Sequence, residues 1–179
     1  MPGIRPATPQ DAEAVARLFR LVRTACLPYL PDLHTPASEL AFFRDRVFPG
    51  CTVWVAGEVA INGFCAWRPG WVDHLYIRPE CQSQGLGTVL LSQAMAAYSP
   101  LRLWAFQRNA QALRFYAARG FRVIERTDGS RNEEREPDAL LEWVRPWKRV
   151  ARAAGFRVAG PAGVPAASRG WPRPAPPAA

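Results

Sequence analysis

Gln82-Ser83-Gln84-Gly85-Leu86-Gly87 is the stretch of sequence from which the fold can be worked out. Residues 71–77 before it are rich in aromatic and β-branched side chains, which predicts a strand. Residues 88–98 after it contain no Gly or Pro, which predicts a helix. A glycine-bearing turn between a strand and a helix points backbone N–H groups at one place, beside the positive end of the helix dipole. The stretch therefore predicts a site for an anion, most naturally a phosphate.

Two other phosphate-binding turns do not match this stretch. A dinucleotide-binding turn needs a third glycine three positions after the second, where this chain has Leu90, and an acidic residue about 20 positions further on. A Walker A loop needs Gly-Lys, which occurs nowhere in the chain. A tight turn with two glycines and no ligand is the alternative that the stretch alone leaves open.

Gln82-x-x-Gly85-x-Gly87 resembles the Gln/Arg-x-x-Gly-x-Gly/Ala acyl-CoA signature of the GNAT N-acetyltransferase superfamily. Residues 109–121, Asn109-Ala-Gln-Ala-Leu-Arg-Phe-Tyr-Ala-Ala-Arg-Gly-Phe121, resemble the second motif of that family and follow in its order. The resemblance covers about residues 4–144 and is specific over residues 72–121. It implies a mixed α/β fold, with a largely antiparallel central sheet, one parallel splayed strand pair and helices on both faces.

Local patterns predict the remaining elements. Thr8-Pro9 has the residues of a helix start, and apolar residues recur after it at helical spacing. Thr35-Pro36 starts a second helix, which should end at Pro49-Gly50. Besides residues 71–77, strands are expected at residues 4–6, 51–56, 59–67, 101–106, 121–126 and 139–144. The short turns between the early strands predict antiparallel pairs. The helix that precedes residues 101–106 predicts that this strand lies parallel to residues 71–77.

Composition predicts one folded domain and a tail. The 179 residues suit a single core, expected over residues 1–145. Residues 146–179 are rich in Pro, Ala and Gly, so they predict a disordered tail. The net charge is +8, but residues 145–179 hold seven basic and no acidic residues. The other 16 basic residues face all 15 acidic ones. The folded part is thus nearly neutral, and a nucleic-acid partner is not expected.

Other features argue for a cytoplasmic protein without a membrane partner. No apolar run approaches the roughly 18 residues of a membrane helix, and the first residues do not resemble a signal peptide. The four cysteines are spread along the chain: Cys26, Cys51, Cys65 and Cys81. Without a secretory signal they are expected to be reduced thiols. His34 and His74 have no cysteine at ligand spacing, so no metal is expected. A homodimer is left open.

The resemblance implies acetyl-CoA, or another acyl-CoA, as the cofactor. Backbone N–H groups of the turn would hold its pyrophosphate, and this set comprises Gln82, Ser83, Gln84, Gly85, Leu86, Gly87 and Thr88. The backbone of Leu75, Tyr76 and Ile77 would pair with the amides of the pantetheine arm, as a strand pairs with a strand. Asn109 would bond to the cofactor, and its alternative is a plain helix N-cap.

Tyr116 occupies the position where the family often has a tyrosine near the cofactor sulfur. Its phenol would give a proton to the leaving thiolate, and its alternative is a core aromatic residue. For the general base, strand alternation puts Trp71, Asp73 and Leu75 on one face, and His74 on the other. The resemblance favours Asp73, whereas His74 has the better intrinsic pKa. An ordered water molecule without a dedicated side chain is the third option.

Candidate acceptor residues flank this strand: Tyr29, Asp32, Trp71, Glu133 and Glu134. Ordinary loop packing or a solvated acidic loop is the alternative for each. The function expected is N-acetyl transfer to the primary amine of a small molecule, by direct transfer in a ternary complex. The alternatives are a protein or peptide amine as the acceptor, a non-catalytic acyl-CoA sensor, or an adaptor that acts through the basic tail.

Overall fold

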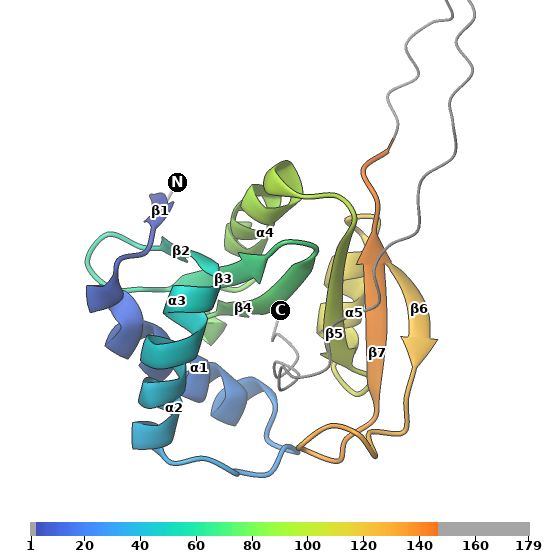
Figure 1. Cartoon of the computed structure of the whole chain (residues 1–179), viewed down its shortest axis with the longest axis horizontal. Helices are drawn as coiled ribbons and strands as arrows, with labels where there is room; N and C mark the ends of the chain where they lie inside the picture. Colours follow the sequence, from blue (N-terminus) through green and yellow to red (C-terminus); the bar gives the residue numbers. More distant parts are fainter. Residues whose placement is uncertain (1–2, 147–179) are drawn as a thin grey trace, which may run out of the picture.

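A seven-stranded sheet runs through the domain in the order β1-β2-β3-β4-β5-β7-β6 (Figure 1). The computed structural model describes residues 3–146, so the predicted tail lies outside the described residues except for Pro146. The strands are β1 Ile4–Pro6, β2 Thr52–Ala56, β3 Gly63–Arg68, β4 Trp71–Ile77, β5 Leu101–Phe106, β6 Arg122–Arg126 and β7 Asp138–Trp143. All neighbouring pairs are antiparallel except β4 and β5. The predicted mixed, largely antiparallel sheet is therefore confirmed.

The helices lie on both faces of this sheet (Figure 1). They are η1 Pro9–Asp11, α1 Ala12–Cys26, α2 Pro36–Phe42, the π-helical turn η2 Phe43–Val47, α3 Phe48–Gly50, η3 Pro79–Cys81, α4 Leu86–Ala97 and α5 Ala110–Ala117. One core packs α1 and η2 against Phe64 and Tyr76. The other packs α4 and α5 against Leu75 and Ile77. Because successive residues of β4 point to opposite faces, this strand joins the two cores.

The parallel pair β4–β5 is held together only at its beginning. Trp71 pairs with Arg102, and the Arg102 backbone N donates to the Gly70 carbonyl oxygen over 2.9 Å. Among the described residues, no later pair continues this ladder, and the two strands diverge toward their C-terminal ends (Figure 1). Since α4 crosses over between them, the turn that precedes α4 lies next to the end of β4. The splayed parallel pair expected from the resemblance is confirmed.

A β-bulge in β4 changes the predicted alternation of faces. Ala66 pairs with His74 and Trp67 pairs with Val72, so Asp73 has no partner residue on β3. The extra residue puts Val72 in the same core as Leu75, although simple alternation predicted opposite faces for them. The predicted facing of residues 71 and 72 is therefore wrong, whereas the opposite facing of His74 and Leu75 holds. The backbone register that shifts at Asp73 is set by β3, which local sequence does not reveal.

Most local predictions are confirmed, and one strand begins later than expected. Thr35 caps α2 by accepting from the Ser38 backbone N over 3.2 Å, and Asn109 caps α5. Residues 59–62 were expected in a strand but form a loop. The Asn62 backbone N donates to the Ala56 carbonyl oxygen over 2.8 Å, and Val59 is fully exposed. Among residues 3–146, no helix is long and apolar enough to cross a membrane.

Candidate functional site

The glycine-bearing turn expected between a strand and a helix lies between β4 and α4. Gly85 is left-handed, with φ of 85°, and so is Ser83, with φ of 61°. Gly87 lies in the first turn of α4, where a Cβ atom would come within 3.2 Å of the Phe115 ring. The side chain of Gln82 anchors the turn, because its Nε2 donates to the Ile77 carbonyl oxygen over 3.1 Å. Gln84 and Thr88 are exposed, and Leu86 is buried.

A cavity of about 420 Å³, called here the turn pocket, opens beside this turn. It is lined by Ile77, Gln82, Ser83, Gly85, Thr88, Gln111, Arg114, Phe115 and Arg119. Its lining therefore holds two guanidinium groups and no carboxylate. The first turn of α4 adds its free backbone N–H groups and the positive end of its dipole. Together these groups make the turn pocket a site for an anion.

Arg119 is held at the wall of the turn pocket without an acidic partner among the described residues. It donates to the Phe115 carbonyl oxygen over 2.6 Å and to the Thr88 hydroxyl, and its guanidinium lies 3.6 Å from the centre of the Phe115 ring. Its Nε is buried and has no hydrogen-bond partner. Burial lowers the pKa of Arg119. An anionic ligand would relieve this unfavourable desolvation.

The side chains of α5 in the turn pocket were not among the predicted site residues. Arg114 and Phe115 follow Gln111 by three and four positions and so share one face of α5, and Arg119 lies two residues beyond the end of this helix. Gln111 Nε2 also donates to Gln82 Oε1 over 3.2 Å, which links the helix to the turn. Helical spacing counted along the second motif is the signal that could have found them.

Tyr116 lies on the buried face of the same helix. It is fully buried between α5 and the sheet, where it contacts Phe115 and Phe121 edge to face. Its hydroxyl has no hydrogen-bond partner. Burial raises the pKa of Tyr116 well above its ordinary value, so the phenol keeps its proton at neutral pH. Asn109 acts as the N-cap that was its alternative, since its Oδ1 accepts from the Ala112 backbone N over 3.0 Å.

The two candidate bases lie in different surroundings. The Asp73 carboxylate is buried and accepts from Arg68 Nε over 2.9 Å and from the Cys51 thiol over 3.4 Å. Its other oxygen, Oδ1, has no partner, and burial raises the pKa of Asp73. Trp71 lies close by, with the Arg68 guanidinium 5.6 Å from its ring centre. Asp73 thus has a free oxygen and an increased proton affinity, as a general base requires.

His74 lies inside an aromatic cluster on the α1 face of the sheet. Its ring centre is 5.3–6.2 Å from the ring centres of Phe19, Phe42, Phe43, Phe64 and Tyr76. The side chain is 1% exposed, and burial lowers its pKa to about 3. Tyr116 belongs to the core on the opposite face. The structure therefore places His74 in the core and away from Tyr116.

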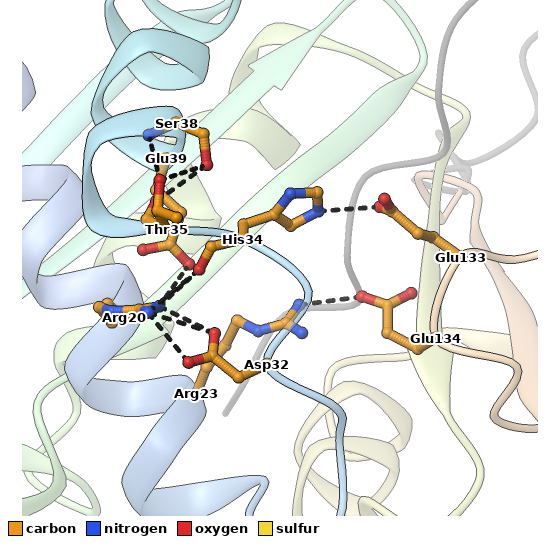
Figure 2. A network of polar contacts seen from close by, with 9 residues as sticks. All are labelled: Arg20, Arg23, Asp32, His34, Thr35, Ser38, Glu39, Glu133 and Glu134. Carbon is orange, nitrogen blue, oxygen red and sulfur yellow. Dashed lines mark hydrogen bonds and ion pairs between the residues drawn. The ribbon is translucent and has the colours of Figure 1, made fainter.

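The predicted acceptor residues of two distant loops come together in one network (Figure 2). We call it the polar network, and it comprises Arg20, Arg23, Asp32, His34, Glu39, Glu133 and Glu134. Arg23 of α1 bonds to Glu134 over 2.9 Å, and both side chains are largely buried. His34 Nε2 lies 3.1 Å from Glu133 Oε2. The first contact connects α1 with residues 127–137, and the second connects residues 27–35 with the same loop.

A second cavity, of about 210 Å³, lies within the polar network. Its lining includes Arg20, Arg23, Asp32, His34 and Glu39, together with apolar residues of the 27–35 loop. We call it the network cavity. Tyr29 belongs to the same loop, and its hydroxyl is buried without a hydrogen-bond partner. The ring of Tyr29 lies 4.2 Å from the Arg108 guanidinium, and burial raises its pKa to about 12.

The structure thus gathers most of the predicted residues into two groups. Gln82, Gly85 and Thr88 line the turn pocket, while Tyr116 lies in the core on that same face. Asp32, Glu133 and Glu134 meet in the polar network, on the side of α1. Asp73 and Trp71 lie near Arg68, apart from both groups. Among residues 3–146, no group of three or more His, Cys, Asp or Glu side chains could hold a metal ion.

Comparison with known proteins points to one family. Residues 49–123 match the family model described as the acetyltransferase (GNAT) domain. The chain is 26% identical over 148 residues to the peptidyl-lysine N-acetyltransferase YjaB of Salmonella typhimurium, covering 82% of this chain and 99% of that protein.

Solved structures of low sequence identity share the fold. The solution structure of apo YjaB from Escherichia coli has a TM-score of 0.66 at 23% identity, covering 80% of this chain and 98% of that one. The PaiA N-acetyltransferase of Thermoplasma acidophilum, in complex with coenzyme A, has a TM-score of 0.61 at 20% identity. That match covers 80% of this chain and 99% of the other.

His74 should make the folded state sensitive to acid. Its pKa is about 3 in the folded chain, against 6.5 for an unperturbed histidine, so the unfolded chain binds the extra proton between these values. Above pH 6.5, His74 is neutral in both states and does not reduce the free energy of unfolding. Below pH 6.5, protonation of His74 in the unfolded chain reduces the free energy of unfolding by about 1.4 kcal/mol per pH unit. Denaturant titrations at pH 7 and pH 5 should show a smaller loss of stability for His74→Phe than for the wild type. His34→Gln, on an exposed side chain, is the control. Equal losses in His74→Phe and the wild type would contradict this.

Proposed function

We propose that this chain is an acetyltransferase of the GNAT superfamily and that it moves an acetyl group from acetyl-CoA to a primary amine. Acetyl-CoA supplies the acetyl group as an activated thioester. The observation that carries the proposal is the turn pocket, with two guanidinium groups, no carboxylate and two left-handed turn residues. The turn N–H groups of residues 83–88, together with Arg114 and Arg119, would hold the cofactor phosphates.

The central strand leaves room for the rest of the cofactor. Beyond Trp71, β4 has no ladder partner on the β5 side among the described residues. We propose that the backbone of Leu75, Tyr76 and Ile77 pairs with an extended amide chain on that side, as the resemblance implied. This role and that of Asn109 remain predictions. Asn109 serves as an N-cap, which is compatible with a further contact from its amide nitrogen.

Two buried side chains support the proton transfers. Tyr116 keeps its proton at neutral pH and has no competing hydrogen bond, so its hydroxyl is suited to protonate a leaving thiolate. Asp73 has a free Oδ1 and a raised pKa, which suit it to accept a proton from the amine, directly or through water. His74 is neutral but enclosed by aromatic rings, so we do not assign it this role.

For the acceptor we favour a lysine side chain of a peptide or protein. YjaB, which this chain matches over 99% of its length, is a peptidyl-lysine N-acetyltransferase. The polar network also has more carboxylates than guanidinium groups, which suits a cationic amine. A small-molecule primary amine is the second candidate, and the small volume of the network cavity, about 210 Å³, supports it.

Acetyl-CoA should stabilise the folded protein through the turn pocket. At about 100 times its dissociation constant it should add about 2.7 kcal/mol, or roughly 5–10 °C in the melting temperature. NADH and ATP should give no comparable shift. Arg119→Gln and Arg114→Gln should each weaken binding about ten-fold, because each removes a charge-assisted contact.

Arg122→Gln is the matched control for these two variants, since Arg122 is exposed on the edge strand β6. It removes the same charge and should bind acetyl-CoA as the wild type does. Binding that is unchanged in both Arg114→Gln and Arg119→Gln would refute the role of the turn pocket.

Tyr116→Phe should separate turnover from cofactor binding. The Tyr116 hydroxyl has no hydrogen-bond partner, so its removal should leave the melting temperature nearly unchanged. Loss of a proton donor should lower kcat by about 100-fold, with acetyl-CoA affinity intact. Tyr98→Phe, on the half-buried tyrosine after α4, removes a hydroxyl elsewhere and should keep full kcat. An unchanged kcat in Tyr116→Phe would remove Tyr116 from the mechanism, while a sensor without turnover would show no kcat in any variant.

The acceptor class can be tested with lysine peptides and free amines at matched concentration. If the acceptor is peptidyl lysine, kcat/KM should be at least about ten-fold higher for an N-terminally blocked lysine peptide than for free lysine or pentylamine. Peptide backbone contacts on the loops around the network cavity would give this difference. A ratio near or below one would favour the small-molecule amine instead.

A further inference from the structure

In the polar network, the guanidinium group of Arg20 forms ion pairs with two carboxylates. Arg20 bonds to Asp32 over 3.0 Å and to Glu39 over 3.2 Å (Figure 2). It also donates to the His34 carbonyl oxygen. The group formed by these three charged side chains therefore has a formal charge of −1. Arg23 does not change this balance, because Glu134 neutralises it.

Glu39 shows that this charge is incompletely satisfied. The residue is 8% exposed and lines the network cavity. One carboxylate oxygen, Oε1, receives the bond from Arg20, while Oε2 is buried without any hydrogen-bond partner. Burial raises the pKa of Glu39, as expected for a carboxylate that lacks compensation. A buried acceptor of this kind costs free energy unless a donor reaches it.

The surroundings of the cavity add negative charge at its entrance. Asp32 is 74% exposed and Glu133 is 62% exposed. Glu133 has only the exposed ring of His34 as its partner in the network. Arg108 and Glu136 form a neighbouring pair at 3.5 Å and contribute no net charge. The potential at the cavity thus favours a cation.

We propose that the network cavity binds a second positive charge of the acceptor, next to the amine that is acetylated. This inference rests on the proposed function and defines its substrate class. The second charge would be an Arg or Lys side chain beside the target lysine in a peptide, or the far ammonium group of a diamine. The second cation would donate hydrogen bonds to Glu39 Oε2 and to Asp32. The two carboxylates would then be balanced by two positive charges, one on Arg20 and one on the acceptor.

The position of the network makes this selection compatible with cofactor binding. Its charged groups come from α1, α2 and the two loops, whereas the guanidinium groups of the turn pocket come from α5 and the residues just after it, on the other face of the sheet. An anionic cofactor and a dicationic acceptor are thus attracted to different places. Arg23 is already paired with Glu134, so this pair would remain when the second cation binds to Glu39 and Asp32.

Steady-state kinetics with paired acceptors test the inference on the full-length chain. One pair is a blocked lysine peptide with Arg beside the lysine, against the same peptide with neutral citrulline. The other pair is cadaverine against pentylamine. With saturating acetyl-CoA, KM for the dicationic member should be about ten-fold lower in at least one pair, with similar kcat. The pair that shows the difference identifies the source of the second charge.

Two variants test whether the KM advantage of the dicationic acceptor depends on the network cavity. Asp32→Asn changes an exposed side chain and should reduce the KM advantage about three-fold at unchanged kcat, since exposed charge pairs contribute modestly. Glu39→Gln should reduce it further, provided that its melting temperature shows a folded protein. Asp45→Asn is the matched control, because Asp45 is equally an exposed aspartate paired with an arginine, Arg44, outside the network. It should keep the full advantage.

The outcomes separate this inference from the function on which it rests. Turnover with equal KM for both members of both pairs would refute the second-cation site and leave the acetyltransferase function standing. A KM advantage that Asp32→Asn and folded Glu39→Gln both retain would also refute it, because the charge would then be recognised elsewhere. Acetyl-CoA binding without turnover of any acceptor would refute the proposed function and this inference together.

Discussion

The parallel pairing of β4 with β5 is the constraint on which both candidate sites depend. Two parallel neighbours need a crossover, and here α4 makes it, so the turn before α4 must lie at the end of β4. The pair is joined only where Trp71 meets Arg102. Every other neighbouring pair in the sheet is antiparallel and has at least three paired positions. Among the described residues, this junction therefore has the fewest paired positions in the sheet, and it is where we propose that the extended arm of the cofactor lies.

The two faces of the sheet differ in the charge that they offer. On the α4–α5 face, the turn pocket offers Arg114 and Arg119 without a carboxylate. On the α1 face, the polar network has four carboxylates against two arginines and one exposed histidine. A near-neutral domain thus carries two local fields of opposite sign. For the proposed transfer from an anionic cofactor to a cationic amine, this arrangement would guide each reactant to its own face and oppose exchange of their positions.

Features that depend on neighbouring residues could be predicted from the sequence. The turn at residues 82–87, the helix start at Thr35, the N-cap Asn109 and the crossover after residue 88 all follow from local chemistry, and the structure confirms them. Features that depend on another strand or loop could not be predicted. The bulge at Asp73 is a mismatch with β3, and the bond between Arg23 and Glu134 joins residues 111 positions apart. Arg119 has features of both kinds. Its helical spacing could be counted along the sequence, whereas its contact with Thr88 could not be predicted from it.

Buried polar atoms without partners distinguish the functional parts of this core from the structural ones. A buried donor or acceptor without a partner is costly, so each instance calls for a physical reason. Glu39 lines the network cavity, where a ligand would supply the missing partner, whereas Tyr116 lies in the core next to Phe115 of the turn pocket. His74 also has an unpartnered Nδ1, but five aromatic rings enclose it and it lines neither the turn pocket nor the network cavity. The same shortage of hydrogen bonds thus indicates a binding site only where a cavity reaches the residue that lacks a partner, which is why Glu39 carries a ligand proposal and His74 does not.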